Sequence, residues 1–570
     1  MESLDSFLPQ TRIAYFSMEI AIRSEMHTYS GGLGGLAGDI VRSCADLELP
    51  VVFVTLASRS GYLKQAIDGQ GRQVDLPDPW DPSAWAEPLE AMAAVPIEGQ
   101  EVWIRPWLHS FTCPLGRRMP VLLLDTDLED NSAEHRRITD HLYGGDAAYR
   151  LKQEIVLGIG GVRILRALGF DIRTYHMNEG HAALLALELL RESRRPSEDV
   201  GQDESIYDPV RVREMCVFTT HTPVAAGHDR FPYDLVQRCL GDYIDLAELR
   251  PLAGGDGLNM TLLALNLSGC INGVARRHAE TTSRFFPGYH VRAITNGVHA
   301  PTWTHASFAR LFEVRTPHWK HEPEVLSFAD QLGDDDVWAA HQEAKRDLLG
   351  LVKAIRGVEM RADLPIFGFA RRMTGYKRPD LLFSDVARLI EIGRRQPFQL
   401  VFAGKAHPHD EPGKRMIEEL HRHMASLSDV VPMAFLPNYD MGIAAALVAG
   451  TDVWLNTPLP PMEASGTSGM KASLNGVLNL SVLDGWWLEG CIEGVTGWAI
   501  GDDGKSDPET AHAGLLYHKL EETVLPLYYQ DRGKWIWMMK QAISKLGAYF
   551  NSQRMMRRYA SEIYMRSMGL

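Results

Sequence analysis

The chain of 570 residues is longer than one hydrophobic core normally supports, so its length predicts two large domains or three smaller ones. Hydrophobic residues make up 45% of the chain and charged residues 23%, which are ordinary values for a soluble globular protein. The formal net charge of −15 argues against nucleic-acid binding, which needs a basic face, although a local cationic cluster could still bind a small anion.

The N-terminus and the cysteines indicate where the protein works. The first ten residues, MESLDSFLPQ, carry two acids and no basic segment before an apolar run, unlike a signal peptide. The six cysteines are scattered, without a CxxC pair or a Cys/His metal spacing, which favours reduced thiols. Three asparagines interrupt the most apolar stretch, residues 258–275, so we expect a buried helix there and no membrane span. The sequence therefore predicts a cytoplasmic protein.

Short β-rich runs alternate with helical patterns along the chain, and several are continuous apolar runs typical of strands buried on both faces of a parallel sheet. The expected strands are RIAYFSME, PVVFVTLA, MPVLLLDTD, IRTYHMNE, MCVFTTHTP, PIFGFARR, FQLVFAGKA, VVPMAFLP, DVWLNTP and GVLNLSVLD. The alternation predicts an α/β, doubly wound architecture.

The domain organisation follows from a lapse of strand signals after ITNGVHAPTW. We expect two Rossmann-like domains facing across a cleft, residues 1–305 and residues 306–570, with the last helix packing back on the first domain. In such sheets ligands bind at the carboxyl ends of the strands, so residues that directly follow strands are the candidates for function.

The first candidate is the glycine cluster YSGGLGGLAGDI, residues 29–40. Glycines at the start of a helix let backbone N–H groups approach an anion, and the helix dipole favours that anion. A flexible turn before a helix would have the same sequence, so the cluster alone leaves both interpretations open.

The ends of two expected strands carry histidine. His176, Glu179 and His181 could be imagined as metal ligands, but the His-x4-His spacing is not a helical i,i+4 pair and the stretch leaves a strand. Polar groups at such a turn more often bond a polyhydroxy ligand or each other, and we predict no metal site. His221, in FTTHTP, lies at the end of the next expected strand.

A cationic cluster, RRMTGYKR, directly follows the strand PIFGFA. It has four cations within eight positions, Arg371, Arg372, Lys377 and Arg378, and the next acid is Asp380. A solvated basic face is possible, but cations at the carboxyl end of a strand favour a phosphate site, with bidentate arginines and a lysine point charge.

The segment MEASGTSGMKASLNG, residues 462–476, also joins a strand to a helix. Its backbone N–H groups could meet a phosphate, and Lys471 lies one to two turns into the expected helix. Burial would lower the pKa of this amine, which could then form a Schiff base or an ion pair. Two phosphate-suited sites fit two separate phosphates or one nucleotide diphosphate sugar, and residue chemistry alone does not choose between them.

In this order the motifs resemble those of the α-glucan (glycogen, starch and maltodextrin) phosphorylases, over nearly the whole chain. The resemblance rests on IAYFSMEI, SGGLGGLAGD, YRLKQEIVLGIGG, HMNEGHAAL, FTTHTPV, AITNGV, RRMTGYKR, FAGKAHP, FLPNYDM, EASGTSGMK and LNGVLNLSVLDG. EASGTSGMK followed by VLDGWW is similar to the shorter bacterial and archaeal branch.

The resemblance implies a GT-B fold and a pyridoxal 5′-phosphate (PLP) cofactor bound by Lys471. It implies reversible phosphorolysis of an α-glucan or maltooligosaccharide by inorganic phosphate, which gives α-glucose 1-phosphate with retention. In this family the substrate phosphate gives a proton to the glycosidic oxygen, so no protein carboxylate pair is required, in contrast to glycoside hydrolysis.

Carried over position by position, the resemblance assigns a catalytic set, a cofactor set and a sugar set. The catalytic residues are Lys471, Arg372, Lys377 and His221. The cofactor is expected to contact Lys471, Thr467, Ser468, Gly31, Gly32 and Tyr439. The sugar is expected to contact Glu463, Ala464, Ser465, Gly466, Asn296, His221, Glu179 and His181, and Lys405 is expected nearby.

The chain departs from the long-form enzymes at four places. Ser468-Gly469 replaces Gly-Asn, Ser30 replaces Asn, and Ala21 aligns with a tyrosine near the cofactor ring. The loop YGGDAAY, which gates the site in long forms, is short here, and their regulatory N-terminal extension is not expected.

Two rival functions remain compatible with these motifs. A nucleotide-sugar-dependent GT-B glycosyltransferase would need a similar phosphate clamp, because fold does not fix function. A catalytically degenerate glucan-binding homologue is the second rival. A homodimer is the commonest assembly, and we expect one.

Overall fold

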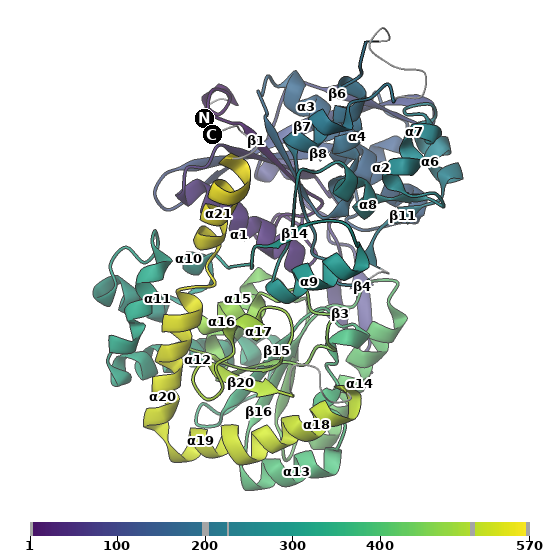
Figure 1. The fold of residues 1–570 in the computed structure, drawn as a ribbon. Coiled ribbons are helices and arrows are strands. Elements are labelled where there is room, and N and C mark those ends of the chain that lie inside the picture. Colours follow the sequence, from purple (N-terminus) through teal and green to yellow (C-terminus); the bar gives the residue numbers. More distant parts are fainter. Residues whose placement is uncertain (1–3, 197–204, 225–226, 502–507, 566–570) are drawn as a thin grey trace.

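The computed structural model describes residues 4–196, 205–224, 227–501 and 508–565, so the first three residues of the N-terminal segment lie outside it. Helices alternate with strands around two sheets that are both rich in parallel strands. The sheets belong to two units, drawn one above the other in Figure 1. The predicted α/β class is confirmed.

The first sheet has ten strands in the order β14-β13-β10-β9-β1-β2-β8-β7-β5, with β6 beside β7. The strands from β14 to β8 are parallel, and β5, β6 and β7 add an antiparallel edge. Their bounds are β1 Ile13–Ser17, β2 Val51–Leu56, β5 Glu87–Pro88, β6 Ala93–Ile97, β7 Gln100–Thr112, β8 Arg118–Asp125, β9 Thr174–Asn178, β10 Cys216–Thr219, β13 Cys270–Gly273 and β14 Val291–Ala293.

Helices bury both faces of the first sheet. Alternate residues of β1 face opposite cores, Ala14 and Phe16 toward one and Ile13 and Tyr15 toward the other, as the two-residue period of a strand requires. The first core includes α2 Ala147–Ile155, α3 Gly161–Ala167, α4 Leu184–Glu192 and α8 Met260–Asn266. The second core includes α1 Gly32–Asp46 and, from the far end of the chain, α21 Ser552–Tyr559.

The second sheet has six strands, all parallel, in the order β17-β16-β15-β18-β19-β20. Its strands are β15 Ile366–Ala370, β16 Gln399–Ala403, β17 Met433–Leu436, β18 Val453–Asn456, β19 Leu478–Val482 and β20 Gly497–Ile500. One face packs on α12 Asp334–Arg356 and α15 Met441–Gly450. The other packs on α13 Val386–Arg395, α14 Glu411–Leu427, α18 Pro508–Lys519, α19 Leu525–Gln530 and α20 Arg532–Gln541.

All ten expected strands are present, each within one to four residues of its expected ends. The interpretation of residues 258–275 as one buried helix is wrong in part. The segment folds as the short buried helix α8 and then as β13, because Ser268 and Gly269 interrupt the apolar run before the strand. In the described ranges, no helix has the length and apolar character needed to cross a membrane.

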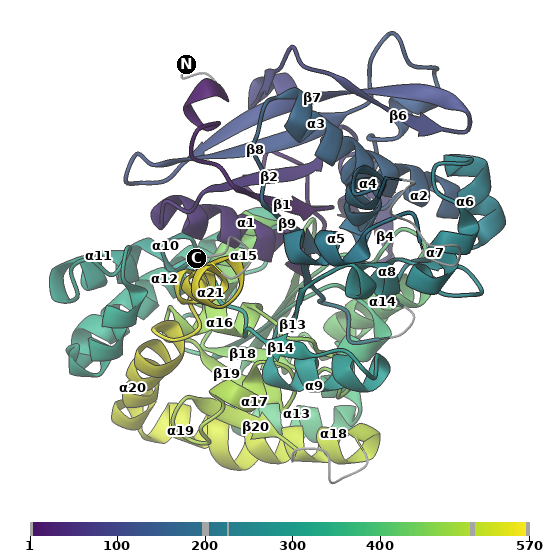
Figure 2. The ribbon, with the colours of Figure 1, turned by 45° about the horizontal axis from the view of Figure 1, so that its top comes forward.

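A hairpin and a helix each extend from one unit onto the other. The hairpin of β3 Lys64–Ile67 and β4 Gln73–Leu76 extends from the first unit, and buried Gln65 and Gln73 donate to the carbonyl oxygens of Gly404 and Ala406, both at 2.9 Å. In the other direction α21 returns to α1, where the hydroxyls of Ser552 and Ser43 lie 2.6 Å apart. Figure 2 shows α21 beside α1 from a second angle.

The remaining elements are connections. They are α5 Pro209–Met215, α6 Tyr233–Leu240, α7 Leu246–Ala253, α9 Arg276–Phe285, α10 Ala300–Trp303, α11 Ala306–Arg315, α16 Ser468–Ser473, α17 Trp487–Gly490, β11 Arg230–Phe231 and β12 Leu258–Asn259.

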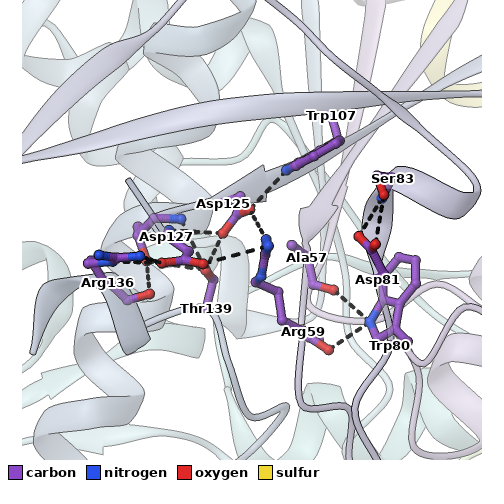
Figure 3. A network of polar contacts seen from close by, with 12 residues as sticks. Ala57, Arg59, Trp80, Asp81, Ser83, Trp107, Asp125, Asp127, Arg136 and Thr139 are labelled. Carbon is purple, nitrogen blue, oxygen red and sulfur yellow. Dashed lines mark hydrogen bonds and ion pairs between the residues drawn. The ribbon is translucent and has the colours of Figure 1, made fainter. Parts of the chain in front are cut away.

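A buried polar network anchors the loop that follows β8 (Figure 3). Asp125, at the end of β8, accepts hydrogen bonds from the Arg59 guanidinium and the Trp107 indole, both at 2.9 Å, and from the Thr139 hydroxyl at 3.3 Å. Because Thr139 lies four residues before the short loop YGGDAAY, which begins at Tyr143, this network fixes the chain from which that loop starts.

The second unit contains a fully buried ion pair. Lys345 of α12 donates to Asp452 at 2.7 Å, and Asp452 also accepts from His341 at 2.9 Å and from the backbone of Ile366 at 2.8 Å. Burial opposes the ionised carboxylate, but Lys345 and His341 outweigh it and lower the pKa of Asp452 to about 2. The network ties α12 to the start of β15 and β18.

We therefore expect Asp452→Asn to destabilise the protein by about 3–5 kcal/mol, because it leaves the Lys345 ammonium buried without its counter-charge. Denaturant unfolding monitored by tryptophan fluorescence measures the change. Glu359→Gln, which breaks the exposed Lys353–Glu359 pair, is the control and should leave the midpoint unchanged. Equal midpoints for the two variants would contradict the prediction.

Candidate functional site

The predicted site residues follow strands of both sheets, at the carboxyl ends where parallel strands place ligands. Glu179 and His181 follow β9, His221 follows β10 and Asn296 follows β14. From the second sheet, Arg371, Arg372 and Lys377 follow β15, and the segment from Glu463 to Lys471 follows β18.

The glycine cluster forms the start of α1. Glu19, just after β1, accepts hydrogen bonds from the backbone N–H groups of Ser30 at 2.6 Å and Gly31 at 3.1 Å. The Gly31 N–H, expected to face a phosphate, is therefore bonded to a carboxylate in this structure. No heavy atom lies within 4 Å of a Cβ position on Gly31 or Gly32, so the helix start borders open space.

Gly34 is required by close packing. A Cβ there would lie 2.6 Å from the Cβ of Tyr29 and 2.7 Å from a carboxylate oxygen of Glu19. The glycines of this cluster therefore serve two purposes: Gly34 lets the chain pack tightly, and Gly31 and Gly32 keep the helix start accessible.

The cations after β15 converge on one carboxylate. Arg371 donates to Glu463 at 2.7 Å and Lys377 donates to the same oxygen at 2.5 Å. Burial opposes ionisation of Glu463, but Arg371 and Lys377 outweigh it and lower its pKa to about 2. One further guanidinium nitrogen of Arg371 is buried without a hydrogen-bond partner.

Arg372 lies apart from this pair. Desolvation lowers its pKa, while the charges of Tyr62 and Glu19 raise it, and the net shift is upward. Arg372 is exposed, so it remains available to an anion beside the glycine cluster. The four cations of the motif thus differ in their surroundings. Arg371 and Lys377 form a buried pair, and Arg372 is accessible. Arg378 donates to the carbonyl oxygens of Thr457 and Pro458.

The segment after Glu463 is held by the turn that follows β19. Asp484 accepts from the backbone N–H of Glu463 at 2.8 Å, and Trp486 donates its backbone N–H to the carbonyl of Ser465 at 2.9 Å. Gly485 has a φ of +54°, and a Cβ there would lie 2.4 Å from the Ser465 carbonyl oxygen. Burial raises the pKa of Asp484 to about 7. This turn fixes the backbone of residues 463–466.

Ser468 and Gly469, which depart from the long-form pattern, have a local explanation. The Ser468 hydroxyl accepts the indole N–H of Trp454 at 3.0 Å. A Cβ on Gly469 would lie 2.3 Å from the Asn479 side chain and 2.7 Å from the Trp486 ring. Ser468 and Gly469 therefore suit the two neighbouring tryptophans: Ser468 bonds Trp454, and Gly469 leaves room for Trp486.

Lys471 lies in α16 and is only 9% exposed. Its Nζ is 3.6 Å from the centroid of the Trp303 ring and would be 3.7 Å from a Cβ on Gly35, in the first turn of α1. Within the described part of the chain, Nζ has neither a hydrogen bond nor an ion pair. Burial lowers the pKa of Lys471 to about 8, with Asp39 opposing and Arg42 adding to the shift. An amine with this pKa is a competent nucleophile near neutral pH.

Glu179 organises the histidine side of the site. Its carboxylate accepts from the backbone N–H of His221 at 2.7 Å, the Thr222 hydroxyl at 2.9 Å and the Gly180 N–H at 3.0 Å. Its φ of +74° is strained for a residue other than glycine. Because this carboxylate is hydrogen-bonded within the protein, Glu179 positions His221. The Nε2 atom of His221 lies 2.6 Å from Asn178 Oδ1.

Desolvation keeps three histidines of β9 and β10 and their ends neutral, and also His278 of α9. It lowers the pKa of His176, His181 and His221 to about 3 each, and that of His278 to about 4. A neutral imidazole is both a donor and an acceptor, which suits sugar hydroxyls. Unpartnered buried atoms are also present here: His181 Nδ1, His278 Nε2 and Asn296 Oδ1.

Other predicted residues lie around this centre. Tyr439 lies near Arg371, and burial raises its pKa. Lys405 donates to the carbonyl oxygen of Leu63 at 2.9 Å, so it joins the two units. Ala464, Ser465, Gly466 and Thr467 form the turn before α16, and the Ser465 hydroxyl is buried and unpartnered. No group of three or more His, Cys, Asp or Glu side chains suited to a metal ion is found among the described residues.

The structure adds site residues that sequence reasoning missed. Tyr143 of the short loop donates to Glu19 at 2.9 Å, its ring stacks under Arg150 at 4.5 Å, and its φ is +56°. Trp303 and Asp39 contact or influence Lys471 from two other elements. No sequence pattern pointed to Trp303, whereas Glu19 and Asp484 each stand at the carboxyl end of a predicted strand and could have been found from that position.

Comparison with known proteins agrees with this geometry. A profile of the carbohydrate phosphorylase family matches residues 228–493. The maltodextrin phosphorylase of Thermococcus litoralis is 38% identical, over 98% of this chain and 71% of its own length. The glycogen phosphorylases of Aquifex aeolicus and Mycobacterium tuberculosis are 35% and 36% identical, over 97% of this chain and 86% and 71% of their own lengths.

These similarities extend over nearly the whole chain, and they include both sheets and all the strand ends described above. The chain belongs to the carbohydrate phosphorylase family. The predicted resemblance is confirmed at the level of the family.

The neutral histidines predict that acid destabilises the fold. Their folded pKa values, about 3 to 4, lie below the ordinary value near 6.5 of an unfolded chain, so the unfolded state binds more protons between these limits. Stability should be full above pH 6.5 and fall as the pH approaches 4. His176→Gln should reduce the slope of the unfolding free energy against pH by up to about 1.4 kcal/mol per pH unit, the contribution of one proton.

Denaturant unfolding at a series of pH values measures this slope, and the values at pH 8 serve as the reference for each protein. A slope that His176→Gln leaves unchanged would contradict the assignment of a neutral, buried imidazole to His176.

Proposed function

We propose that the protein is a PLP-dependent α-glucan phosphorylase, a hexosyltransferase that releases α-glucose 1-phosphate from the non-reducing end of an α-1,4-glucan with retention. The proposal includes a GT-B fold whose Rossmann-like domains are residues 1–305 and 306–570. The observation that carries it is the convergence of a buried, low-pKa lysine, Lys471, with the open start of α1 from the other unit.

The side chains at this point fit PLP. Lys471 supplies an uncharged fraction of amine near neutral pH for the covalent tether, and the Trp303 ring face lies against that amine. The open cradle at Gly31 and Gly32, with the N–H groups of the first turn of α1, suits a phosphate group. Thr467 and Tyr439 are the further proposed contacts. PLP, when bound, supplies a 5′-phosphate that takes part in proton transfer with the substrate phosphate.

The cations provide the site for substrate phosphate. Arg371 and Lys377 are held in place by Glu463, and Arg372 is exposed beside the glycine cluster. Preorganised positive charge of this kind stabilises negative charge that develops in a transition state, at little reorganisation cost. We propose that these cations hold inorganic phosphate against the anomeric carbon.

The pKa of Glu463, about 2, excludes this carboxyl as the acid. At neutral pH this carboxyl is ionised, so it cannot donate a proton to the glycosidic oxygen. We propose that the phosphate OH is the donor, and that the Glu463 oxygen not bonded to Arg371 and Lys377 accepts hydrogen bonds from glucose hydroxyls. This division of roles supports phosphorolysis over hydrolysis by a carboxylate pair.

The neutral imidazoles and the unpartnered polar atoms supply the sugar subsite. His221 and Asn296 are proposed to bond the glucose ring, with His181 and the residues from Ala464 to Gly466 around it. Each of these groups can donate or accept without a change in charge, so the subsite recognises hydroxyls without electrostatic preference for an acid or a base.

The expected partners are the α-glucan or maltooligosaccharide, inorganic phosphate and glucose 1-phosphate. The acidic net charge makes nucleic acid a poor partner. All six thiols are unpaired, as a reducing compartment requires, and a cytoplasmic homodimer is part of the proposal.

Activity is tested with maltooligosaccharides of several lengths and inorganic phosphate, and separately with UDP- or ADP-glucose. Glucose 1-phosphate in the first mixture alone is the expected result. Turnover of a nucleotide sugar would instead establish the glycosyltransferase alternative, and sugar binding without turnover of either would establish the degenerate homologue.

The cofactor is tested chemically. After incubation with PLP and reduction with borohydride, peptide mass spectrometry should find a pyridoxyl group on Lys471. Lys471→Arg should lose both the label and phosphorolysis, while retaining the unfolding midpoint of the unmodified protein to within a few degrees. A protein that carries no pyridoxyl group on any lysine would overturn the proposal.

Lys377→Met removes one of the two cations on Glu463. We expect phosphorolysis to fall roughly 10²–10³-fold, because one preorganised charge at the transferring phosphate is lost. Initial rates over a range of phosphate concentrations measure the effect, and Lys353→Met, an exposed lysine of α12, is the control. Equal rates for the two variants would exclude a phosphate role for Lys377.

A further inference from the structure

Asp39, on the second turn of α1, is a buried carboxylate without an assigned role. Its side chain is 1% exposed. Both of its oxygens accept the indole N–H of Trp303, at 3.0 and 2.8 Å. The Arg42 guanidinium lies 3.7 Å away. Asp39 therefore determines where the indole of Trp303 lies.

Trp303 in turn borders the amine of Lys471. The Nζ atom lies 3.6 Å from the centroid of the indole, over the face of the ring. A ring face attracts an ammonium group, and the attraction is greatest when both groups are desolvated, as they are here. Three helices thus contribute to one buried cluster: α1 provides Asp39, α10 provides Trp303 and α16 provides Lys471.

The charges that act on Lys471 both come from α1. Asp39 favours the protonated amine and Arg42 disfavours it. Arg42 is itself fixed, because its guanidinium donates to the carbonyl oxygens of Ala21 and Ile22 at 3.1 and 2.6 Å. Asp39 is therefore the acidic group whose charge acts on this desolvated amine.

We propose that Asp39 is the positioning residue of Lys471: it orients the Trp303 ring against the amine and provides its counter-charge across the unit boundary. The inference rests on the proposed function only in naming PLP as the group that the amine receives. Without the carboxylate, the indole N–H would be a buried donor without a partner and the ring would lose its fixed orientation.

The same helix offers a matched control in Asp46, two turns further along. Asp46 is 8% exposed and accepts from His299 at 2.9 Å and from Gln553 at 2.6 Å. It also joins α1 to α10, since His299 is the N-cap of that helix. It is not among the groups that act on Lys471. Asp46→Asn therefore removes a comparable buried carboxylate without changing the cluster of Asp39, Trp303 and Lys471.

The experiment compares the full-length chain with Asp39→Asn and Asp46→Asn. In Asp39→Asn the amide oxygen can still accept the indole N–H, so the charge is removed while the ring contact is kept. Asp39→Ala removes both. The first measurement is the PLP concentration that gives half-maximal pyridoxyl labelling of Lys471 after borohydride. The second is the titration of the Lys471 amine in PLP-free protein, followed by NMR after ¹³C reductive methylation, with the signal assigned by its loss in Lys471→Arg.

For Asp39→Asn we expect the Lys471 amine to titrate about one pH unit lower, because its counter-charge is gone. Asp39→Ala should in addition raise the PLP concentration for half-labelling by about tenfold or more, because the ring is no longer oriented. Asp46→Asn should lower the unfolding midpoint to a similar degree and leave both measurements as in the unmodified chain.

Identical titration and labelling in the Asp39 and Asp46 variants would overturn the inference and leave Asp39 a purely structural residue. If the unmodified chain takes no pyridoxyl group on Lys471, the proposed function fails, whereas the titration still decides whether Asp39 acts on the amine. The two failures are thus distinguishable.

Discussion

Helix α1 holds the two units in register, and the geometry of the site depends on that contact. Its first turn borders Lys471 of the second unit, Asp39 and Asp46 accept from the two ends of α10, and Ser43 meets the returning helix α21. Gly38 makes the contact with the first unit possible, since a Cβ there would lie 1.9 Å from the Ala21 carbonyl oxygen. A shift of α1 by one ångström would therefore change the surroundings of the amine, the indole and the glycine cradle together.

Desolvation is the second constraint, and it acts in opposite directions on the groups of the site. It lowers the pKa of Lys471 to about 8 and of His221 to about 3, and it raises that of Asp484 to about 7. Glu463 is the exception, because Arg371 and Lys377 outweigh its burial. The site thus presents an amine, imidazoles and a carboxylate in distinct protonation states at one pH, which follows from where each group lies and not from its residue type.

Packing and hydrogen bonding explain the residues at which this chain departs from the long-form sequence pattern. Gly469 has no room for a side chain beside Trp486 and Asn479, and the Ser468 hydroxyl is bonded to Trp454. Ala21 is fully buried, and its carbonyl oxygen is used by Arg42. In the shortened loop, Tyr143 adopts a left-handed backbone and bonds Glu19, so a single aromatic side chain occupies the region between the loop and the glycine cluster. This chain therefore builds the surroundings of Lys471 from its own tryptophans and acids.

The sequence by itself determined the α/β class, the ten strands, the family and the segments that carry the site, because continuous apolar runs and turn residues act locally. It did not determine that residues 258–275 divide into a helix and a strand, since periodicity cannot separate a short buried helix from a buried strand. Nor did it determine which partners the site residues have. Glu463 pairs with Arg371 and Lys377, and Glu179 accepts a hydrogen bond from the backbone of His221. Asp39 acts on Lys471 through Trp303. These contacts join residues that are 42 to 432 positions apart in the sequence. Only the tertiary structure decides such contacts, because they depend on how two sheets and one helix are placed in space and not on any local pattern.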